Sequence, residues 1–457
     1  MDANTELRIL VTPKPPIVAD ELAHIGAGLR FAENATEYLA ALRKTYGDTF
    51  LLDVFGYKLF CVFSPKGLES LYALPEEKAS FGFATFDLLS FKTPTELFLD
   101  TDLNLFYQLL VKKQLPRYLA TTNSVLDQEL NRWANCSELE VFDAVRTLEQ
   151  RIGYGLWICK EAASDEYWPR LKAQFDVLDQ EKAFVDPAQT LHTLKSNKAG
   201  EKAAISAIRE LLTELASGLD LDNSDDTLAY LYRHFSAFDG EDLHRRVAHN
   251  CINTNQGFLS NLYAAIAWVL VRLLQYPDVA DKVREEISAT EQQFGSQWRS
   301  NIEALDSMKY LEQVLMESVR LSQRSITLRK VLEPVEVATE SERYTVNKGV
   351  YVTTLLSVKN TDTDALSAFD PDHYEGNRLK PELTPGGKEQ VSTFGHGKHA
   401  CPAQKFSHMM CKTVVAAVLE RFDLKLLSRE CEPSSRQIGG VARSAEPATI
   451  QLVARSA

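Results

Sequence analysis

The order of apolar and polar residues divides the chain into a short β-rich start, a long helical middle and a β-rich end. After 35 irregular, proline-containing residues, residues 36–46 carry apolar side chains at helical spacing. Two strand-like runs follow, TFLLDVFG and YKLFCVFS, with a glycine at their junction. Because apolar runs that meet at a short turn are typical of paired strands, we expect a β-hairpin over 48–64.

From residue 66 to 322 the apolar positions recur mostly at the spacing of helices. The expected helices cover residues 66–75, 100–120, 123–134, 141–162, 168–180, 201–217, 226–236, 242–275, 278–293 and 307–322. The segment 242–275 is unusually long, and its second half is apolar on nearly all faces. A helix that is hydrophobic all round is normally buried in the middle of a large protein. We therefore expect this segment to be a long central helix.

Short β-rich runs return after residue 325. The runs EPVEVAT and YTVNKGVYVTTLL are strand-like, and Asn347-Lys348-Gly349 supplies a turn within the second. A loop rich in Asp, Pro and Gly covers 359–393, and a helix then runs from about 402 to 422 before a tail of short strands.

These patterns predict one mainly α-helical domain of the α+β class covering residues 1–457. The β-rich parts are expected at 48–64, at 325–356 and in the C-terminal tail, and the helical parts at 66–322 and 402–422. We find no internal repeat, low-complexity tract or linker that would divide the chain.

Composition and charge exclude several classes of partner. The net charge of −13 argues against a nucleic-acid surface, which needs a basic stripe. The first 22 residues contain prolines and charges where a signal peptide needs an apolar run. The apolar half of the central helix, around 262–275, is interrupted by Arg272 and is too short to cross a hydrocarbon core of about 30 Å. We therefore expect a cytoplasmic protein, or one that rests on a membrane surface without a transmembrane anchor.

The cysteines are odd in number and scattered, with no Cys-x-x-Cys pair. They are Cys61, Cys136, Cys159, Cys251, Cys401, Cys411 and Cys431. This spacing fits neither a disulfide framework nor a zinc site. A reducing compartment and mostly buried, inert thiols are the simplest interpretation.

Cys401 lies in a segment with different chemistry, Phe394-Gly-His-Gly-Lys-His-Ala-Cys401-Pro402-Ala403. Gly395 and Gly397 let the backbone turn tightly and approach a flat surface closely. Pro402 suits the first turn of a helix, and the free N–H groups of a helix N-terminus favour a thiolate over a thiol. A thiolate that ligates haem iron promotes cleavage of the O–O bond. A buried cysteine under a glycine-rich turn is the alternative.

The complete pattern, Phe-x-x-Gly-x-His-x-Cys-x-Ala, resembles the haem-binding loop of the cytochrome P450 family. The matching positions are Phe394, Gly397, His399, Cys401 and Ala403. The resemblance implies haem b with Cys401 as the axial iron ligand, between the long central helix and the helix that follows the cysteine. It also implies that Phe394, Gly395 and Gly397 line the haem and that His399 faces a propionate.

Other segments of the chain resemble the same family, in the same order. Glu317 and Arg320 stand where the family has its Glu-x-x-Arg pair, which would brace the loop around Arg378 or a nearby residue. Arg329 stands where the family often has an arginine that binds a propionate. Further matches are Tyr344–Gly349, Phe369–Arg378, and Trp268 with Pro277.

The central helix departs from the family pattern at the two positions beside the oxygen site. Ser260 replaces the usual acid and Asn261 the usual threonine. Serine and asparagine can hold a water molecule by hydrogen bonds, but neither is itself an acid. Three interpretations stay open: proton delivery through Ser260, Asn261 and ordered water; a peroxide-using or peroxide-rearranging enzyme that needs no relay; or a register that is shifted by one turn.

An asparagine at this point resembles the branch that contains sterol 7α-hydroxylases and prostacyclin synthase, whose members hydroxylate and isomerise, respectively. Phe106-Tyr107 with Lys112 and Lys113 also replaces the family's Trp-x-x-x-Arg, as that branch tends to do. One of these lysines would reach a propionate as a point charge, or both are solvated at a helix end. The resemblance implies a sterol-like or other lipid substrate.

The expected function is a haem-thiolate monooxygenase that activates dioxygen and hydroxylates an apolar substrate. The chain has no Gly-x-Gly-x-x-Gly dinucleotide fingerprint, so electrons must come from a separate ferredoxin or flavoprotein reductase. An acidic partner would dock near Lys398, Lys405 and Lys412. The alternatives are a haem-thiolate isomerase, dehydratase or peroxygenase without an electron donor, and a non-catalytic haem- or ligand-binding protein.

Overall fold

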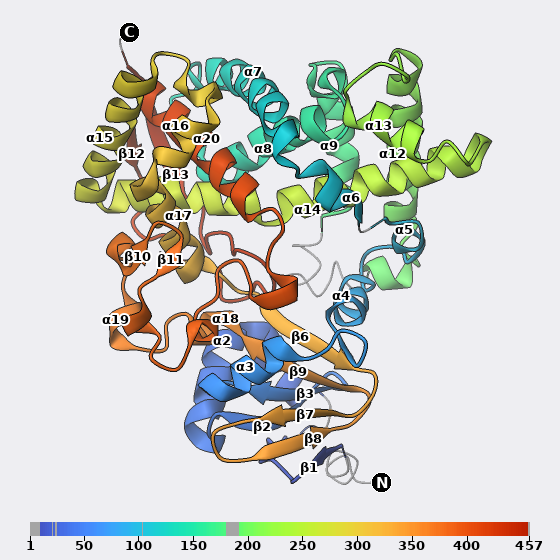
Figure 1. Cartoon of the computed structure of the whole chain (residues 1–457), viewed down its shortest axis with the longest axis vertical. Coiled ribbons are helices and arrows are strands. Elements are labelled where there is room, and N and C mark those ends of the chain that lie inside the picture. The colour runs from blue at the N-terminus through green and yellow to red at the C-terminus, as the bar shows by residue number, and fades with distance from the viewer. Residues whose placement is uncertain (1–9, 21, 23–24, 103, 180–191, 456–457) are drawn as a thin grey trace. The chain divides into compact units, whose positions relative to one another are not determined.

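The computed structural model describes residues 10–20, 22, 25–102, 104–179 and 192–455. The chain forms two compact units, each built from segments that are far apart in the sequence (Figure 1). The β-rich unit consists of residues 1–91, 319–401 and 433–442. The helical unit consists of residues 92–318, 402–432 and 443–457. The predicted mainly helical fold with a small β-rich portion is confirmed.

The β-rich unit contains a five-stranded sheet in the order β2-β3-β9-β6-β4 and a three-stranded sheet in the order β1-β8-β7. The strands of the first are β2 (Thr49–Val54), β3 (Tyr57–Val62), β9 (Val350–Leu355), β6 (Ile326–Val331) and β4 (Ala79–Ser80). Those of the second are β1 (Val11–Thr12), β8 (Arg343–Val346) and β7 (Val335–Ala338). Strand β9 pairs parallel with β3 and antiparallel with β6, so the two predicted β-rich segments meet in one sheet.

Helices and a short hairpin complete this unit. They are α2 (Gly26–Tyr46), α3 (Pro65–Ala73), α4 (Phe81–Leu89), α18 (Leu356–Lys359), α19 (Asp364–Ser367), β10 (Tyr374–Glu375) and β11 (Arg378–Leu379). The segment predicted as a loop at 359–393 therefore contains short elements of its own.

The predicted hairpin is confirmed, with the two-residue turn Phe55-Gly56 between β2 and β3. Both turn residues have positive φ, 51° and 90°, which matches the twist of the flanking strands. The Gly56 N–H donates to the Asp53 carboxylate at 2.8 Å. A positive φ is unfavourable for a bulky residue such as Phe55. The Phe55 ring packs closely on Gly28, since a Cβ on Gly28 would lie only 2.6 Å from the ring carbons.

The helical unit contains most of the long helices. They are α5 (Glu96–Leu99), α6 (Asn104–Leu109), α7 (Leu115–Trp133), α8 (Val141–Trp157), α9 (Trp168–Val177), α12 (Ala199–Ser217), α13 (Thr227–His234), α14 (Gly240–Gln275), α15 (Pro277–Phe294), α16 (Ile302–Ser307) and α20 (Gln404–Arg421). A small sheet has the order β12-β13-β5, with β12 (Phe422–Leu426), β13 (Thr449–Ala454) and β5 (Glu138–Glu140). Helix α17 (Lys309–Ser322) crosses the boundary between the units.

The predicted boundary between helices at 100–120 and 123–134 is wrong. The chain forms α6, then a 3₁₀ turn at Lys112–Gln114, and α7 then runs through the expected break. Pro116 stands in the first turn of α7, where its missing N–H costs no helical hydrogen bond. Proline therefore sets the start of this helix, which apolar periodicity alone does not reveal.

Helix α14 has 36 residues and packs antiparallel along α8. Phe142 contacts Trp268 with ring centroids 5.2 Å apart, and Trp157 contacts Phe258 at 5.6 Å. The helix is long and apolar enough to span a membrane, contrary to the expectation from its apolar half. Two thirds of that apolar window is nevertheless buried by packing, as in the core helix of a large protein.

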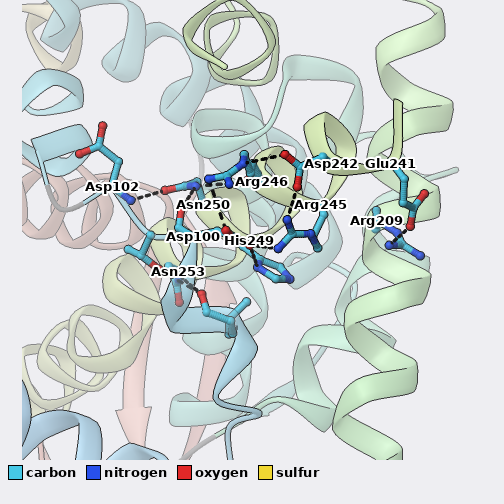
Figure 2. A network of polar contacts seen from close by, with 12 residues as sticks. Asp100, Asp102, Arg209, Glu241, Asp242, Arg245, Arg246, His249, Asn250 and Asn253 are labelled. Carbon is cyan, nitrogen blue, oxygen red and sulfur yellow. Dashed lines mark hydrogen bonds and ion pairs between the residues drawn. The ribbon is translucent and has the colours of Figure 1, made fainter. Parts of the chain in front are cut away.

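A polar network joins the first half of α14 to the segment between α5 and α6 (Figure 2). The Asp100 carboxylate lies 3.3 Å from Arg246 Nη1 and 3.2 Å from His249 Nδ1, and it also pairs with Arg245. Asn250 donates to the Asp100 carbonyl oxygen at 2.9 Å. The Asp100 side chain is 7% exposed. This largely buried carboxylate therefore gathers three cationic or potentially cationic groups, of which His249 is buried and the two arginines are partly exposed.

We expect Asp100→Asn to lower the free energy of unfolding by about 2 kcal/mol, because it removes the largely buried charge that the buried His249 and the partly exposed Arg245 and Arg246 share. Asp242→Asn is the matched control, since Asp242 pairs with the same two arginines but is 42% exposed. Its effect should be smaller than that of Asp100→Asn, because solvent screens this exposed carboxylate. Urea unfolding of both variants measures the difference, and equal effects would contradict the assigned role of Asp100.

Candidate functional site

Cys401 ends a tight loop in the β-rich unit, just before α20 in the sequence. Its backbone N–H donates to the Phe394 carbonyl oxygen at 2.7 Å, which closes the loop. Gly395 and Gly397 have φ of 76° and 64°, and a Cβ on Gly395 would lie 3.0 Å from the His399 carbonyl oxygen. Both glycines are therefore required by the backbone path, and the Cys401 side chain is left half-buried.

The other cysteines differ from Cys401 in exposure or in setting. Those that are buried are Cys61, Cys159, Cys251, Cys411 and Cys431, and Cys136 is exposed. Burial raises the pKa of the Cys159 thiol to about 12. It also raises the pKa values of the Cys61, Cys251 and Cys411 thiols. Of the seven cysteines, all within the described residues, Cys401 alone combines partial exposure with a glycine-shaped loop.

Arg320 braces the chain that leads to this loop. Its guanidinium is fully buried and donates to the carbonyl oxygens of Leu366 at 2.6 Å and Ala368 at 3.1 Å, and also to that of Asn360. Glu317, one turn earlier on α17, is also fully buried. The Asn360 amide in turn donates to the Ser392 carbonyl oxygen at 2.9 Å and accepts from the Ser392 N–H at 2.9 Å. Asn360 therefore ties the Arg320 anchor to the start of the cysteine loop, a role with no signal in the sequence.

Arg378 lies exposed on β11, and the Arg320 guanidinium donates to carbonyl oxygens in the segment 360–368. The segment Phe369–Arg378 resembles a family pattern, Phe-x-Pro-x-Arg, and His373 stands at its fifth position when the count begins at Phe369. His373 is 9% exposed. Counting from Phe369 could have identified His373 as the residue that stands at the arginine position of this pattern. His373 is largely buried, whereas Arg378 is exposed.

Arg329 and His399 lie close together in the β-rich unit. The Arg329 side chain is 1% exposed, and its guanidinium lies over the Phe81 ring at 5.2 Å from the centroid. Its Nε has no hydrogen-bond partner among the described residues, and Nη1 donates only to the neighbouring Leu328 carbonyl oxygen. His399 Nε2 lies 3.0 Å from the Glu76 carboxylate. Burial, and then the nearby Arg329 charge, lower the pKa of His399.

Ser260 and Asn261 lie exposed on α14 in the helical unit. Asn261 donates to Ser260 Oγ at 3.1 Å, and Ser260 Oγ donates to the Gly257 carbonyl oxygen at 3.4 Å. Lys112 and Lys113 are exposed on the 3₁₀ turn before α7.

Ser260 also borders a cavity of about 70 Å³ inside the helical unit. Sequence reasoning missed the main polar residue of this cavity, Glu149 on α8. Glu149 is fully buried, neither carboxylate oxygen has a hydrogen-bond partner among the described residues, and burial raises the pKa of the side chain to about 8. A helical pattern with a glutamate on one face gives no sign of such burial.

One of the three lysines expected to dock a partner is wrongly assigned. Lys412 is 2% exposed and donates to the Glu312 carboxylate and, at 3.0 Å, to the Leu305 carbonyl oxygen. Its ammonium is therefore enclosed between α20 and α17. Lys398 and Lys405 are exposed.

Comparison with known proteins gives consistent matches. The family model described as cytochrome P450 matches residues 174–452. Mouse cytochrome P450 7B1 is 23% identical over 442 residues, which cover 91% of this chain and 86% of that protein. Rat 25-hydroxycholesterol 7-alpha-hydroxylase is 30% identical over 182 residues, 37% of this chain and 44% of that protein. The structure of cyanobacterial CYP120A1 with retinoic acid bound has a TM-score of 0.72 at 17% identity, and the match covers 97% of this chain and 99% of that chain.

The buried Glu149 carboxyl should make stability depend on pH. Its pKa is about 8 when folded, against an ordinary 4.5, so between these values the folded state keeps a proton that the unfolded chain has released. The free energy of unfolding then falls as pH rises through this window, and the stabilisation that is present below it is lost above it. Glu149→Gln, which resembles the neutral acid, should remove this fall and be more stable than the wild type at pH 9 by on the order of 4 kcal/mol.

Urea unfolding of the wild type and of Glu149→Gln across this pH range measures the effect. The difference between the two curves isolates Glu149 from other titrating groups. Parallel curves would contradict a neutral Glu149 in the folded protein.

Proposed function

The chain belongs to the cytochrome P450 family, and on this premise we propose that Cys401 is the thiolate ligand of its haem and that the substrate is a sterol-like lipid. The protein is a haem-thiolate monooxygenase, as its curated relatives are named. The half-buried Cys401 on its glycine-shaped loop is the observation that carries the ligand assignment. Haem b supplies the activation of dioxygen when it is bound.

The residues of the β-rich unit fit such a group. A buried guanidinium without a carboxylate partner among the described residues, as in Arg329, is suited to a haem propionate. His399 would add a second polar contact, and Phe394, Gly395 and Gly397 would lie against the macrocycle. Glu317 and Arg320 would act as scaffold, with Arg320 holding segment 360–368. Arg378 stays proposed as a structural residue, and Lys112 and Lys113 as contacts to a propionate. All three have less support than Arg329, because their side chains are exposed.

The substrate assignment rests on relatives and on the central helix. The rat relative is named a 25-hydroxycholesterol 7-alpha-hydroxylase, and the aligned segment is 30% identical to this chain. Asn261 stands where the branch that contains such enzymes has asparagine. We propose that Ser260 and Asn261 hold water and direct protons during turnover, since both carry groups that donate and accept hydrogen bonds.

Electrons would come from a separate ferredoxin or flavoprotein reductase. Lys398 and Lys405 are exposed near the cysteine in the sequence and would meet an acidic surface of that partner. A location in the cytoplasm or at a membrane surface is part of the same proposal.

The serine and asparagine of α14 also favour a second candidate, a haem-thiolate isomerase, dehydratase or peroxygenase. Such an enzyme would turn over without NAD(P)H or a reductase. Product formation that depends strictly on the electron donor supports the monooxygenase and excludes this alternative.

The ligand assignment predicts the absorption spectrum of the dithionite-reduced protein with carbon monoxide. The wild type should show the red-shifted Soret band of a thiolate-ligated haem, and Cys401→His should lose it, because imidazole replaces the thiolate. Cys136→Ser is the control, since Cys136 is exposed and lies outside the loop. A red-shifted band that survives in Cys401→His would rule out Cys401 as the ligand.

The propionate assignment predicts that Arg329→Gln loses haem faster than the wild type. A charge-assisted pair is worth about 1.5–3 kcal/mol, so we expect transfer to excess apomyoglobin to accelerate by about tenfold or more. Arg343→Gln, on an exposed position of β8, should transfer haem at the wild-type rate. Equal rates for both variants and the wild type would remove Arg329 from the haem site.

A further inference from the structure

The cavity beside α14 is bordered by three α8 residues that carry buried polar atoms without a hydrogen-bond partner among the described residues. These atoms are Glu149 Oε1 and Oε2, Gln150 Oε1 and the Tyr154 hydroxyl, all on α8. Buried polar groups are normally hydrogen-bonded, and an orphaned group costs about 1–3 kcal/mol. A cavity of about 70 Å³ has the room for ordered water beside these side chains.

The packing of α8 on α14 brings Glu149 level with Ser260. Gly153 meets Asn255 and Phe258, since a Cβ there would lie 3.1 Å from the Phe258 ring and 3.3 Å from Asn255 Oδ1. One end of the antiparallel pair is set by the contact between Phe142 and Trp268. Glu149 lies between these two levels, so it faces the turn of α14 that carries Ser260, and both residues border the cavity.

A second set of polar contacts leads from the cavity toward solvent. The Gln150 amide donates to the Asp176 carboxylate at 2.8 Å, and Asp176 also accepts from Lys172. The Asp176 side chain is 33% exposed. Arg146 lies at the same end, 3.1 Å from Asp176 and 2.9 Å from Asp179. Polar groups therefore extend from the partly exposed Asp176 on α9, along α8, to Ser260 on α14.

We propose that Glu149 is the proton-holding group of a buried relay that runs from Asp176 through the hydrated cavity to Ser260. It supplies the acid that α14 itself lacks at Ser260 and Asn261. Glu149 acts through water and Ser260 Oγ, and is therefore a positioning residue for proton transfer. The inference rests on the monooxygenase function proposed above.

The stoichiometry of monooxygenation requires a supply of protons. One substrate C–H, one dioxygen, two electrons from the reductase and two protons give one alcohol and one water. If the protons are not directed, the same two electrons and two protons convert dioxygen to hydrogen peroxide instead. A carboxyl that is neutral at working pH can donate a proton and regain one from solvent at the partly exposed Asp176, whereas Ser260 and Asn261 can only pass one along.

The surroundings of Glu149 keep it neutral through burial. Its own helix presents Arg146 and Tyr154, α9 and the residues after it present Asp176 and Asp179, α14 presents Tyr263, and α20 presents Cys411. Of these, Arg146 is already engaged by Asp176 and Asp179. Burial is the cause that raises the pKa of Glu149 to about 8, so the acid holds its proton at pH 7.

Infrared difference spectroscopy of the holoenzyme tests the relay without any turnover. The wild type should show the C=O stretch of a neutral carboxyl at pH 7, lost as pH rises past about 8 and absent from Glu149→Gln. Ser260→Ala and Tyr154→Phe should move the band, because each removes a hydroxyl that borders the same cavity. Tyr118→Phe should not, since that hydroxyl is bonded to the Leu109 carbonyl oxygen away from the cavity. No band, or a band that ignores Ser260→Ala, would overturn the proposal.

The second readout is the coupling efficiency, the amount of product formed per electron pair that the reductase supplies. In Glu149→Gln we expect product per electron pair to fall by at least about tenfold and hydrogen peroxide to rise, with unchanged substrate affinity and no alkaline loss of rate near pH 8. Glu149→Asp should recover part of the coupling. Glu420→Gln is the matched control, because burial also raises the pKa of Glu420 but its side chain does not line the cavity. Wild-type coupling in Glu149→Gln would overturn the relay.

The two readouts separate the relay from the function on which it rests. If no substrate is oxygenated with any electron donor, the monooxygenase assignment fails. The infrared band still tests whether Glu149 is neutral and whether it is coupled to Ser260 across the cavity. If oxygenation is coupled but the band is missing, the function holds and the relay is wrong.

Discussion

Complete burial of a guanidinium group organises the part of the chain that carries Cys401. Arg320 has no exposed surface, so its N–H groups must find acceptors within the protein. It takes three carbonyl oxygens between residues 360 and 368 and thereby fixes a segment with little regular structure. Asn360 passes this constraint to Ser392, next to the cysteine loop. The position of Cys401 thus depends on a buried cation far from it in the sequence.

Three buried ionisable side chains, Arg320, Arg329 and Glu149, differ in how many of their polar atoms have hydrogen-bond partners. Arg320 has its acceptors, whereas Arg329 Nε and the Glu149 carboxylate have no partner among the described residues. Unsatisfied buried groups in native proteins call for a ligand, a water molecule or a chemical role. Arg329 stands where an anionic group would complete it, and Glu149 borders a cavity beside α14. These two unsatisfied groups are the ones to which we assign roles in the proposals above, and the satisfied Arg320 is the one we assign to the scaffold.

The two halves of α14 lie in different environments within the helical unit, one polar and one apolar. The first half of α14 is held by ion pairs around Asp100 (Figure 2), and its second half by aromatic and aliphatic packing on α8. Glu149 is buried on α8 where this apolar packing is strong, which explains why its charged form is disfavoured. The same packing that stabilises the unit therefore also tunes the acid proposed to supply protons.

The sequence by itself determined the fold class, the β-hairpin, the central helix and the family, because these features depend on contiguous patterns such as residues 394–403. It could not decide which side chains are buried or paired, since that depends on elements that meet only after folding. Lys412 is a surface cation by composition, yet α17 encloses it with Glu312. Arg378 is exposed on β11, whereas His373 in the same segment is largely buried, a difference that spacing does not reveal. Glu149 and Asn360 acquire their roles from neighbours more than 30 residues away, Ser260 and Ser392 respectively. Spacing along the chain is local information, whereas desolvation and pairing are properties of the tertiary packing.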